Sequence, residues 1–319
     1  RIDFVFYKFI LPRGNVKVSN RILGADIGLM YSKFVLIKDG KKDQILDTLV
    51  LPTPEGTVND GELTEPEMLA SKFRPIFKER RIKAKSLAVA ISSSRTIIRE
   101  LKLSSAIKDP EIPNAILFDL SQTFSDIQKT HYISYKIYSR NEELIKGIVS
   151  MCPKTIVDSY KTFAASMGIP FRYADVSPNC LAKASKFLKS LNPDAIILAD
   201  IGYLKSEIML IINGKLYLNR FVSRGSAYLD NMLTTRLGIA EEDTDKAKRN
   251  QLGSISISKD DIVNIAAEAY LPIEEQIRHT INYFSYNKLG NNLNHIYITG
   301  GGSNVLGLNE YYRRRFGID

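Results

Sequence analysis

The sequence predicts an α/β protein built from two copies of one strand-rich unit, with a small α+β subdomain inserted into the first copy. A buried apolar strand ends in Asp-Ile-Gly at 21–28, and another ends in the same tripeptide at 195–202. Each is followed by a second strand, a tight Asp-Gly or Asn-Gly turn and a third strand, which is the pattern of a β-meander. Between the copies, strands and helices follow in the order β-α-β-β-α, which is typical of an α+β subdomain.

In the first copy, a helix is predicted over 64–81, because apolar residues recur there at helical spacing. Thr64 is expected to cap this helix, with Glu67 at the capping-box position, and Pro75 is expected to kink or split it. The order of elements is therefore βββαβ. The strands are predicted at 21–28, 32–38, 45–51 and 86–91.

The remaining predicted strands and helices belong to the inserted segment and to the second copy. The inserted segment is expected to contain strands at 96–103, 131–138 and 144–151 and helices at 113–124 and 153–167. The second copy is expected to contain strands at 171–175, 195–202, 206–213, 215–222 and 295–299. Its helices are predicted at 178–191, 226–237 and 262–287. The predicted domains are an N-terminal segment (1–20), a first lobe (21–94 and 168–192), the inserted subdomain (95–167) and a second lobe (193–319).

The composition is that of a packed globular protein. Of the 319 residues, 44% are hydrophobic and 25% are charged, which excludes wholesale disorder. No apolar run approaches the roughly 20 residues of a membrane helix, and the apolar stretch 4–11 lacks the cleavage site of a signal peptide. Two cysteines, Cys152 and Cys180, suit a reducing cytoplasm and are expected in the core rather than as nucleophiles. Three histidines without a CxxC motif argue against a structural zinc site.

The net charge of +9 is concentrated in one segment. Residues 72–85 hold seven Lys or Arg and one Glu, which account for six of the nine charges. The sequence favours a solvated helix face whose long basic side chains cover apolar surface, with an acidic partner or an anionic lipid surface as the alternative. Nucleic acid is not expected as a partner, because no basic motif is interleaved with aromatic residues.

Two hairpin tips carry the residue types that bind phosphate. Glycine lets the main chain approach a phosphate closely, and a hydroxyl or ammonium group from the following strand can complete the contact. An aspartate at the mouth of each hairpin can hold Mg²⁺, directly or through its waters. The first hairpin offers Asp26, Gly28, Ser32 and Lys33, and the second offers Asp200, Gly202, Lys205 and Ser206.

A third glycine-rich motif, TGGGSN at 299–304, follows the last strand and would let a base or ribose lie against the main chain. The order of these motifs resembles the actin-like ATPase superfamily and, more narrowly, the family of the type IV pilus assembly protein PilM, which is related to FtsA. The segments ISSSRTIIREL (91–101) and RGSAYLDNMLTTRLGI (224–239) add to the resemblance. It covers roughly residues 21–316.

The resemblance implies an ATP–Mg²⁺ site between the two lobes, with a role for each matching residue. Asp26, Gly28, Ser32 and Lys33 would bind phosphate, Asp200, Gly202 and Ser206 would form the second phosphate loop, and the two aspartates would hold the metal. Gly225 and Ser226 would lie near the ribose, beside Asp245 and Lys248, and Gly300, Gly301 and Gly302 would face the adenosine. Two residues depart from the family pattern: Ser226 replaces a glycine, and Asp245 replaces a glutamate.

No residue in the sequence can be assigned as the group that activates water. We therefore expect nucleotide binding with at most slow ATP hydrolysis. Two alternatives stay open. A phosphotransferase of the same superfamily would need a placed general base, and an FtsA-like division protein would need an amphipathic membrane anchor. The sequence shows neither feature.

The first eight residues, RIDFVFYK, differ from the hairpin pattern. They resemble the N-terminal tail of PilN, the inner-membrane partner of the PilM family, which binds as an extended peptide in a groove between the first subdomain and the inserted one. Residues 11–15 would then be a linker; the alternative is an ordinary leading segment of the domain. The matching residues are Arg1, Ile2, Asp3, Phe4, Tyr7 and Lys8.

The resemblance also implies a place of action. The expected protein is cytoplasmic, lies at the inner face of the cell membrane and recruits the tail of a PilN-type protein during type IV pilus assembly. It would contact the membrane only through its partners. Self-association is left open.

Overall fold

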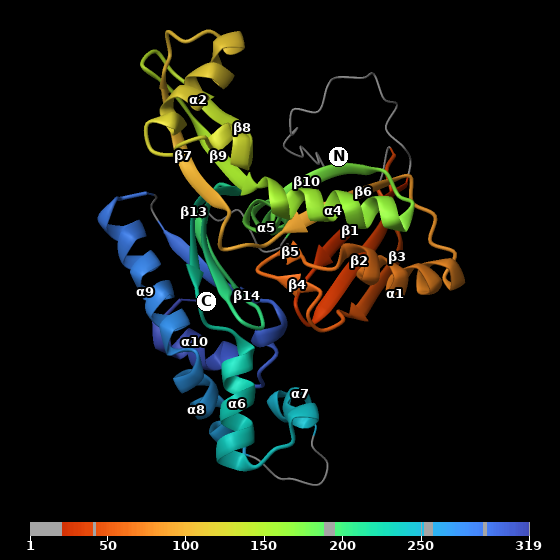
Figure 1. Ribbon diagram of the computed structural model, residues 1–319. Coiled ribbons are helices and arrows are strands. Elements are labelled where there is room, and N and C mark those ends of the chain that lie inside the picture. The colour runs from red at the N-terminus through yellow and green to blue at the C-terminus, as the bar shows by residue number, and fades with distance from the viewer. Residues whose placement is uncertain are drawn as a thin grey trace. The chain divides into compact units, whose positions relative to one another are not determined.

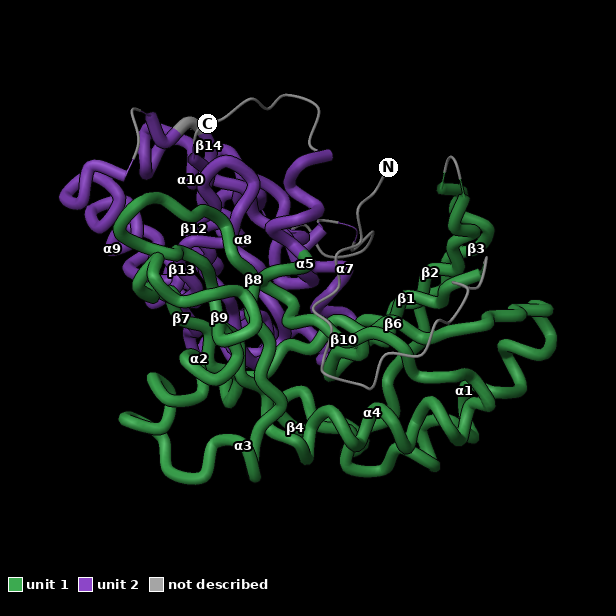
Figure 2. The backbone as a smooth tube through the Cα atoms, turned by 90° about the horizontal axis from the view of Figure 1, so that it is seen from above, with its two compact units in different colours: residues 1–180 green, residues 181–319 purple. Residues whose placement is uncertain are grey.

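The computed structural model describes residues 21–40, 43–187, 195–249, 251, 258–289 and 292–318. The chain forms two compact units, residues 1–180 and residues 181–319, which Figure 2 distinguishes by colour. Each unit has its own hydrophobic core. The boundaries predicted for the lobes and the inserted subdomain stay predictions.

A five-stranded sheet organises the first unit (Figure 1). The central strand β1 pairs antiparallel with β2 and parallel with β6, so the predicted opening meander is confirmed. Alternate residues of β1, Leu23, Ala25 and Ile27, are buried, as the period of a strand requires. The strand order is β10 (Phe171–Val176), β6 (Ser86–Ile91), β1 (Arg21–Ile27), β2 (Tyr31–Lys38) and β3 (Gln44–Pro52).

Two helices, α1 (Pro66–Glu79) and α4 (Lys154–Met167), cover one face of this sheet (Figure 2). Their buried residues share a core with the strands, in which aromatic rings meet edge to face. The ring centroids of Phe34 and Phe73 are 5.4 Å apart, and those of Phe73 and Phe163 are 6.4 Å apart. Phe73 thus contacts both the sheet and α4.

The start and course of α1 differ from two predictions. The helix begins at Pro66 without a side-chain cap, and the Thr64 hydroxyl donates to the carbonyl of Gly56 at 2.5 Å instead, so the predicted capping box is wrong. Pro75 was predicted to kink or split the helix, and the split is wrong, because α1 is continuous through it. Phe73 and Phe77 are buried on either side of Pro75, and this burial offsets the roughly 3 kcal/mol that an interior proline costs.

The inserted sheet has the predicted order of elements. Its central strand pairs antiparallel with both neighbours, and Ile116, Leu120 and Val149 belong to a separate core. Two short elements were not predicted, the turn η1 (Asp109–Glu111) and the helix α3 (Ile127–Thr130). The remaining elements are the strands β7 (Ile97–Ser104), β9 (Leu144–Pro153) and β8 (His131–Arg140), in this spatial order, and the helix α2 (Ile112–Ser121).

A short hairpin, also not predicted, precedes α1. It consists of β4 (Val58–Asn59) and β5 (Glu62–Leu63), and its two turn residues, Asp60 and Gly61, both have positive φ angles, 45° and 80°. Two successive positive φ angles are typical of the tight turns that join hairpin strands.

The second unit repeats the meander. Its strand β11 (Ala195–Ile201) pairs antiparallel with β12 (Ser206–Ile212) and parallel with β14 (Leu293–Thr299), as β1 does with β2 and β6. The strand β13 (Lys215–Val222) lies on the far side of β12. The predicted duplication is therefore confirmed in the two sheets.

The helices of the second unit correct one further prediction. The stretch 262–287 is not one helix, because it is divided at Tyr270 into α8 (Lys259–Ala269) and α9 (Leu271–Tyr286). Pro272 lies in the first turn of α9, where its missing N–H costs nothing, and it cannot continue α8. The other helices are α6 (Ser226–Leu237), η3 (Glu241–Asp243), α7 (Thr244–Lys248), η4 (Gly301–Ser303) and α10 (Leu308–Phe316).

The connection between the units begins with α5 (Ser177–Ala184), which is followed by the turn η2 (Ser185–Phe187). The predicted helix 178–191 therefore ends earlier than expected, and its last residues, 188–191, lie outside the described residues. Among the described helices, none combines the length and the apolar character that crossing a membrane requires.

Candidate functional site

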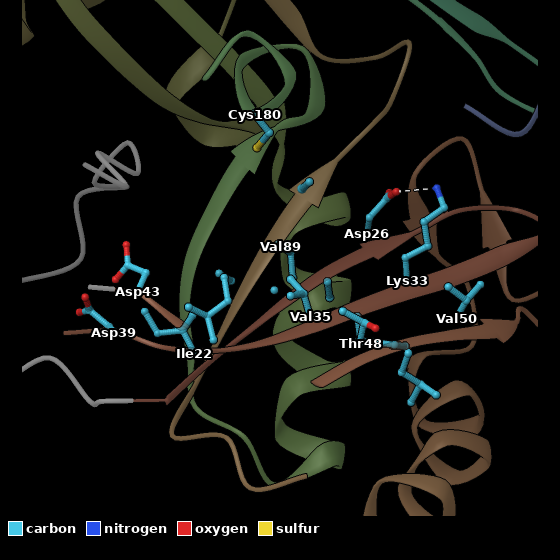
Figure 3. A pocket seen from close by; sticks show the side chains of 17 residues that line it. Ile22, Asp26, Lys33, Val35, Asp39, Asp43, Thr48, Val50, Val89 and Cys180 are labelled. Carbon is cyan, nitrogen blue, oxygen red and sulfur yellow. Dashed lines mark hydrogen bonds and ion pairs between the residues drawn. The ribbon is translucent and has the colours of Figure 1, made fainter. Parts of the chain in front are cut away.

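The first hairpin brings its four predicted residues to one end of the first sheet. The Gly28 N–H donates to the carbonyl of Tyr31 at 3.1 Å and closes the tip. The Lys33 ammonium lies 2.9 Å from Oδ2 of Asp26, and about half of each side chain is exposed. Figure 3 shows this ion pair, in which both side chains stand on the same face of the sheet. A cation and a carboxylate are thus presented together beside the glycine tip.

Ser32 takes a different position from the one that phosphate binding requires. It is fully buried, and its hydroxyl lies 2.8 Å from the hydroxyl of Thr53. The Thr53 N–H in turn donates to the carbonyl of Met30 at 2.9 Å. Ser32 therefore ties the hairpin to the segment after β3, and Thr53 is a partner that sequence reasoning missed.

A second acidic residue shares this end of the sheet. Asp26 and Asp175 are both in register with Ala90 of β6, which lies between their strands. Strand spacing places the two Cα atoms about 10 Å apart. Asp175 is buried and accepts hydrogen bonds from Asn179 Nδ2 at 2.6 Å and from the Val176 N–H at 2.8 Å. Sequence reasoning missed it, although, like Asp26, it stands near the carboxyl end of its strand.

The second hairpin repeats the local geometry of the first. The Gly202 N–H donates to the carbonyl of Lys205 at 3.1 Å. Ser206 is buried like Ser32, and its hydroxyl donates to the carbonyl of Arg224 at 2.7 Å. In both copies the serine hydroxyl therefore bonds within the protein and fixes the hairpin.

Gly225 allows the start of α6 to touch this second tip. A Cβ atom at Gly225 would overlap the main chain of Tyr203, so only glycine fits there. The two N–H groups that follow, those of Ser226 and Ala227, donate to the carbonyls of Gly202 and Tyr203, both at 2.9 Å. These first-turn donors of α6 are thus satisfied by the hairpin itself.

The glycines after β14 meet the end of β11. Gly300 has a φ of 85°, and a Cβ atom there would overlap the Asp200 carboxylate. A Cβ atom at Gly302 would overlap Ile201, and the carbonyl of Gly302 accepts a hydrogen bond from the Tyr270 hydroxyl at 2.9 Å. Gly301 alone faces open space. Packing therefore requires the outer two glycines, and the middle one offers an accessible main chain.

Lys248 and Asp245 lie in one cluster with a residue that sequence reasoning missed, Asp230 of α6. The Lys248 ammonium is 2.8 Å from Asp230 and 2.6 Å from Asp245. Burial and then the charge of Asp230 raise the pKa of Tyr203, a residue of the second hairpin tip. The sequence spacing could have indicated Asp230, because it stands one helical turn after Ser226 and thus on the same side of α6.

The structure therefore gathers the predicted residues into two groups. The first unit holds Asp26, Gly28, Ser32 and Lys33, and the second unit holds Asp200, Gly202, Ser206, Gly225, Ser226, Asp245, Lys248 and Gly300–Gly302. The candidate peptide, residues 1–8, lies outside the described residues. Within the described ranges, no cluster of three or more His, Cys, Asp or Glu residues is placed to bind a metal ion.

Among the described residues of the first unit, two hollows lie near the predicted residues. The one between the inserted sheet and β10 holds only about 10 Å³, close to one water, and is lined by residues that include Tyr132, Cys152 and Asp175. The other, of about 450 Å³, lies on the face of the first sheet opposite α1 and α4 (Figure 3). Most of the residues that line it are apolar. Asp39 and Asp43 lie at one end of the hollow, and Asp26 and Lys33 of the first hairpin lie at the other end.

Comparison with known proteins agrees with this architecture. The model of the family described as "Type IV pilus assembly protein PilM" matches residues 24–319. Comparison with curated proteins gave no match. Among solved structures, the chain is similar to one described as a PilM-PilN type IV pilus biogenesis complex. The identity is 17%, the match covers 93% of this chain and 86% of that chain, and the TM-score is 0.77.

Two further structures share the fold. One is the ethanolamine utilization protein EutJ from Carboxydothermus hydrogenoformans, with 15% identity, coverage of 96% of this chain and 85% of that chain, and a TM-score of 0.56. The other is MreB5 of Spiroplasma citri bound to ADP, with 11% identity, coverage of 94% and 90%, and a TM-score of 0.54. These likenesses confirm the predicted actin-like fold, and the family match identifies the branch. The chain belongs to the family of the type IV pilus assembly protein PilM.

Proposed function

We propose that this chain binds ATP with Mg²⁺ and uses the bound nucleotide to control its contact with a PilN-type inner-membrane protein at the cytoplasmic face of the membrane. The observation that supports nucleotide binding best is the convergence of motifs in the second unit. Gly202, Gly225 and Gly300 all meet at the end of β11, and a Cβ atom at any of them would overlap a neighbouring main-chain carbonyl. Such packing brings three glycine-bearing segments together and leaves main chain as the surface that a ligand meets.

The charged groups suit a polyphosphate. Lys33 would contact the phosphates from the first hairpin, and the main-chain atoms of the two tips would approach them closely. The residues fit a metal as well, since Asp26 and Asp200 supply the carboxylate oxygens that Mg²⁺ prefers, directly or through water. The bound Mg²⁺ would neutralise phosphate charge.

Hydrolysis is not part of the proposal. A general base must be placed within reach of the attacking water, and the sequence offers no residue that can be assigned this role. The chain is therefore proposed to act as a nucleotide-dependent clamp with at most slow turnover.

The binding site is tested with Lys33→Ala and Asp200→Ala. Each should lower ATP affinity, measured by titration calorimetry, by at least tenfold, because each removes a charged group from the proposed phosphate and metal contacts. The melting temperature of Lys33→Ala should stay within a few degrees of the parent, since Lys33 is half exposed. Lys129→Ala, which removes an exposed cation of the inserted subdomain, is the matched control. Unchanged ATP affinity in both variants would contradict the assignment.

Partner binding is tested with peptides. A fluorescent Arg-Ile-Asn-type tail peptide and a peptide of residues 1–8 should both bind the chain from which residues 1–20 have been deleted. Tyr132→Ala should weaken binding of both peptides, because Tyr132 lines the hollow between the inserted sheet and β10. That hollow is too small for a side chain, so binding would have to widen it. If a scrambled peptide bound equally well, the proposed recognition of a PilN-type tail would be contradicted.

A further inference from the structure

The basic segment 72–85 is open to solvent along its whole length. It holds seven Lys or Arg, and the structure leaves the side chain of each one exposed. Within the described ranges, Arg80 alone among the seven forms an ion pair, with Asp47 at 2.6 Å. Six positive charges are therefore left for solvent or for a partner. They belong to Lys72, Arg74, Lys78, Arg81, Lys83 and Lys85.

The helix α1 does not balance its own charge. Its buried residues, which include Phe73 and Phe77, face the core of the first sheet. Arg74 and Lys78 stand four residues apart, and like charges at this spacing repel each other along a helix. Neither of them has an acidic residue three or four positions away. A negatively charged partner would relieve this repulsion.

The segment after α1 presents cations at alternate positions. Arg81, Lys83 and Lys85 are exposed, whereas Ile82 and Ala84 between them pack against the core of the first unit. Arg81 has a φ of 54°, in the left-handed region where a helix usually ends on glycine. Stability alone would favour glycine there, so the arginine keeps a charge at the surface at the expense of backbone strain.

Two further cations lie at the same end of the first sheet. The parallel strands β1, β6 and β10 all begin at this end. The Lys85 N–H donates to the carbonyl of Arg21, the first residue of β1, at 2.9 Å. Arg172 is the second residue of β10, and both arginine side chains are exposed. We call this surface the basic end. It consists of Arg21, Arg74, Lys78, Arg81, Lys83, Lys85 and Arg172.

The basic end is separate from the first hairpin tip. The strand β1 has seven residues and connects the two, so they lie about 20 Å apart. Asp39 and Asp43 are near the start of β1, but they line the hollow on the face of the sheet opposite α1 (Figure 3). A partner that covers the basic end would thus leave the hairpin tip accessible.

The chemistry of the basic end favours lipid over protein as the partner. Specific protein interfaces are built around apolar or aromatic side chains that become buried. Among the exposed large hydrophobic side chains of the described residues, Met68 is the one that belongs to α1, and none belongs to 80–85. Anionic headgroups need no such anchors, because each Lys or Arg near a charged bilayer adds to the attraction.

We propose that the basic end binds directly to a membrane surface that carries anionic phospholipids. Headgroup phosphates would accept hydrogen bonds from the lysine and arginine side chains. The resemblance to the PilM family implies membrane contact only through partners, whereas this contact is made by the first unit itself. It does not depend on bound nucleotide.

The test measures how the full chain partitions onto lipid vesicles, by co-sedimentation. At about 0.1 M salt the chain should bind phosphatidylcholine vesicles that contain roughly 30% phosphatidylglycerol, and should not bind pure phosphatidylcholine. About 1 M salt should abolish binding, because the Debye length falls from about 10 Å to about 3 Å. Lys83→Gln combined with Lys85→Gln should lower the partition coefficient by at least tenfold.

Lys129→Gln combined with Lys146→Gln is the matched control. It removes two exposed lysines of the inserted subdomain and changes the net charge by the same amount. This variant should bind anionic vesicles within twofold of the parent. An equal loss in the two double variants would overturn the proposal, because lipid binding would then follow net charge and not the basic end.

Arg81→Gly separates charge from folding. Glycine adopts the φ of 54° without strain, so this variant should melt at a higher temperature than the parent. It should nevertheless bind anionic vesicles at least threefold more weakly, because one cation is lost. Parent-like lipid binding in Arg81→Gly and in the Lys83, Lys85 variant would overturn the proposal.

Two other polyanions test the choice of lipid. Double-stranded DNA and polyglutamate are added to the parent at the same salt concentration. Neither should displace the chain from anionic vesicles. If the chain bound either polyanion in preference to the vesicles, lipid would be the wrong ligand for the basic end.

Discussion

Asp60 holds Ser94 through both of its carboxylate oxygens, one accepting from the main-chain N–H at 3.0 Å and the other from the hydroxyl at 2.7 Å. The turn between β4 and β5 thus anchors the segment through which the chain passes from the first sheet into the inserted one. Arg95, one residue further on, adds an ion pair to Glu62 at 2.6 Å. The inserted sheet is therefore attached through a polar junction as well as through the main chain.

The first prediction concerns this junction. Asp60→Asn should lower the free energy of unfolding by about 1 kcal/mol and Asp60→Ala by about 2–3 kcal/mol, because hydrogen bonds to an ionised group are worth about 1.5–3 kcal/mol. Asparagine also tolerates the positive φ at this position better than alanine does. Urea unfolding measures both values. Asp126→Asn is the control, since Asp126 has a similar φ of 52° but pairs with the exposed Lys129. Equal losses in both asparagine variants would contradict the prediction.

The second prediction separates two neighbouring glycines. Gly300→Ala should destabilise the protein by at least about 2 kcal/mol, because the added Cβ overlaps Asp200 and the φ of 85° disfavours alanine. Gly301→Ala meets open space and should leave the stability unchanged, but should lower ATP affinity if the adenosine lies there. Thermal unfolding and calorimetric titration together make the distinction. A stable Gly300→Ala variant would show that the contact with β11 is not required.

The third prediction concerns the two thiols and pH. Burial raises the pKa of Cys152 to about 11, although a hydrogen bond with Thr96 and the charge of Arg95 act in the opposite direction. A thiol reagent at pH 8 should therefore label the half-buried Cys180 and leave Cys152 unlabelled until the protein unfolds. Because the folded pKa is the higher one, the stability contributed by the protonated thiol is present below about pH 9 and is lost as pH rises towards 11.

Cys152→Ser supplies the measurement for this pH dependence. The difference in unfolding free energy between the parent and the variant should be constant below about pH 8.5 and should shrink above it. Labelling of Cys152 in the folded protein at pH 8, at a rate equal to that of Cys180, would contradict the burial of this thiol.

The fourth prediction tests the core of the first unit. Phe73 is 2% exposed and contacts Phe34 and Phe163, so Phe73→Ala should cost about 3–5 kcal/mol. Phe118 of α2 is 71% exposed, and Phe118→Ala should change the stability by less than about 0.5 kcal/mol. Denaturant unfolding of the two variants gives both numbers. Similar losses at the two positions would mean that the core is not organised around Phe73.

The fold and part of the site could be predicted because their signals are local. Strand period, turn dipeptides and the repeated Asp-Ile-Gly are properties of neighbouring residues, and they gave the two meanders and the positions of Gly28 and Gly202. The direction of the Ser32 and Ser206 hydroxyls depends on Thr53 and Arg224, which are distant in sequence. Asp230 and Lys248 likewise meet only in the folded chain. Long-range contacts of this kind leave no periodic pattern in the sequence.

The pairing of β10 with β6 has a consequence for how the chain folds. These neighbouring strands are separated by about 80 residues of sequence, and closing so long a loop costs conformational entropy. The inserted sheet pairs Ile97 with Met151, which brings the two ends of the insertion together before β10 arrives. The loop that remains open is then about 25 residues, which saves about 1 kcal/mol of closure entropy. An insertion that folds early would thus shorten the open loop and help β10, the last strand of the first sheet along the chain, to pair with β6.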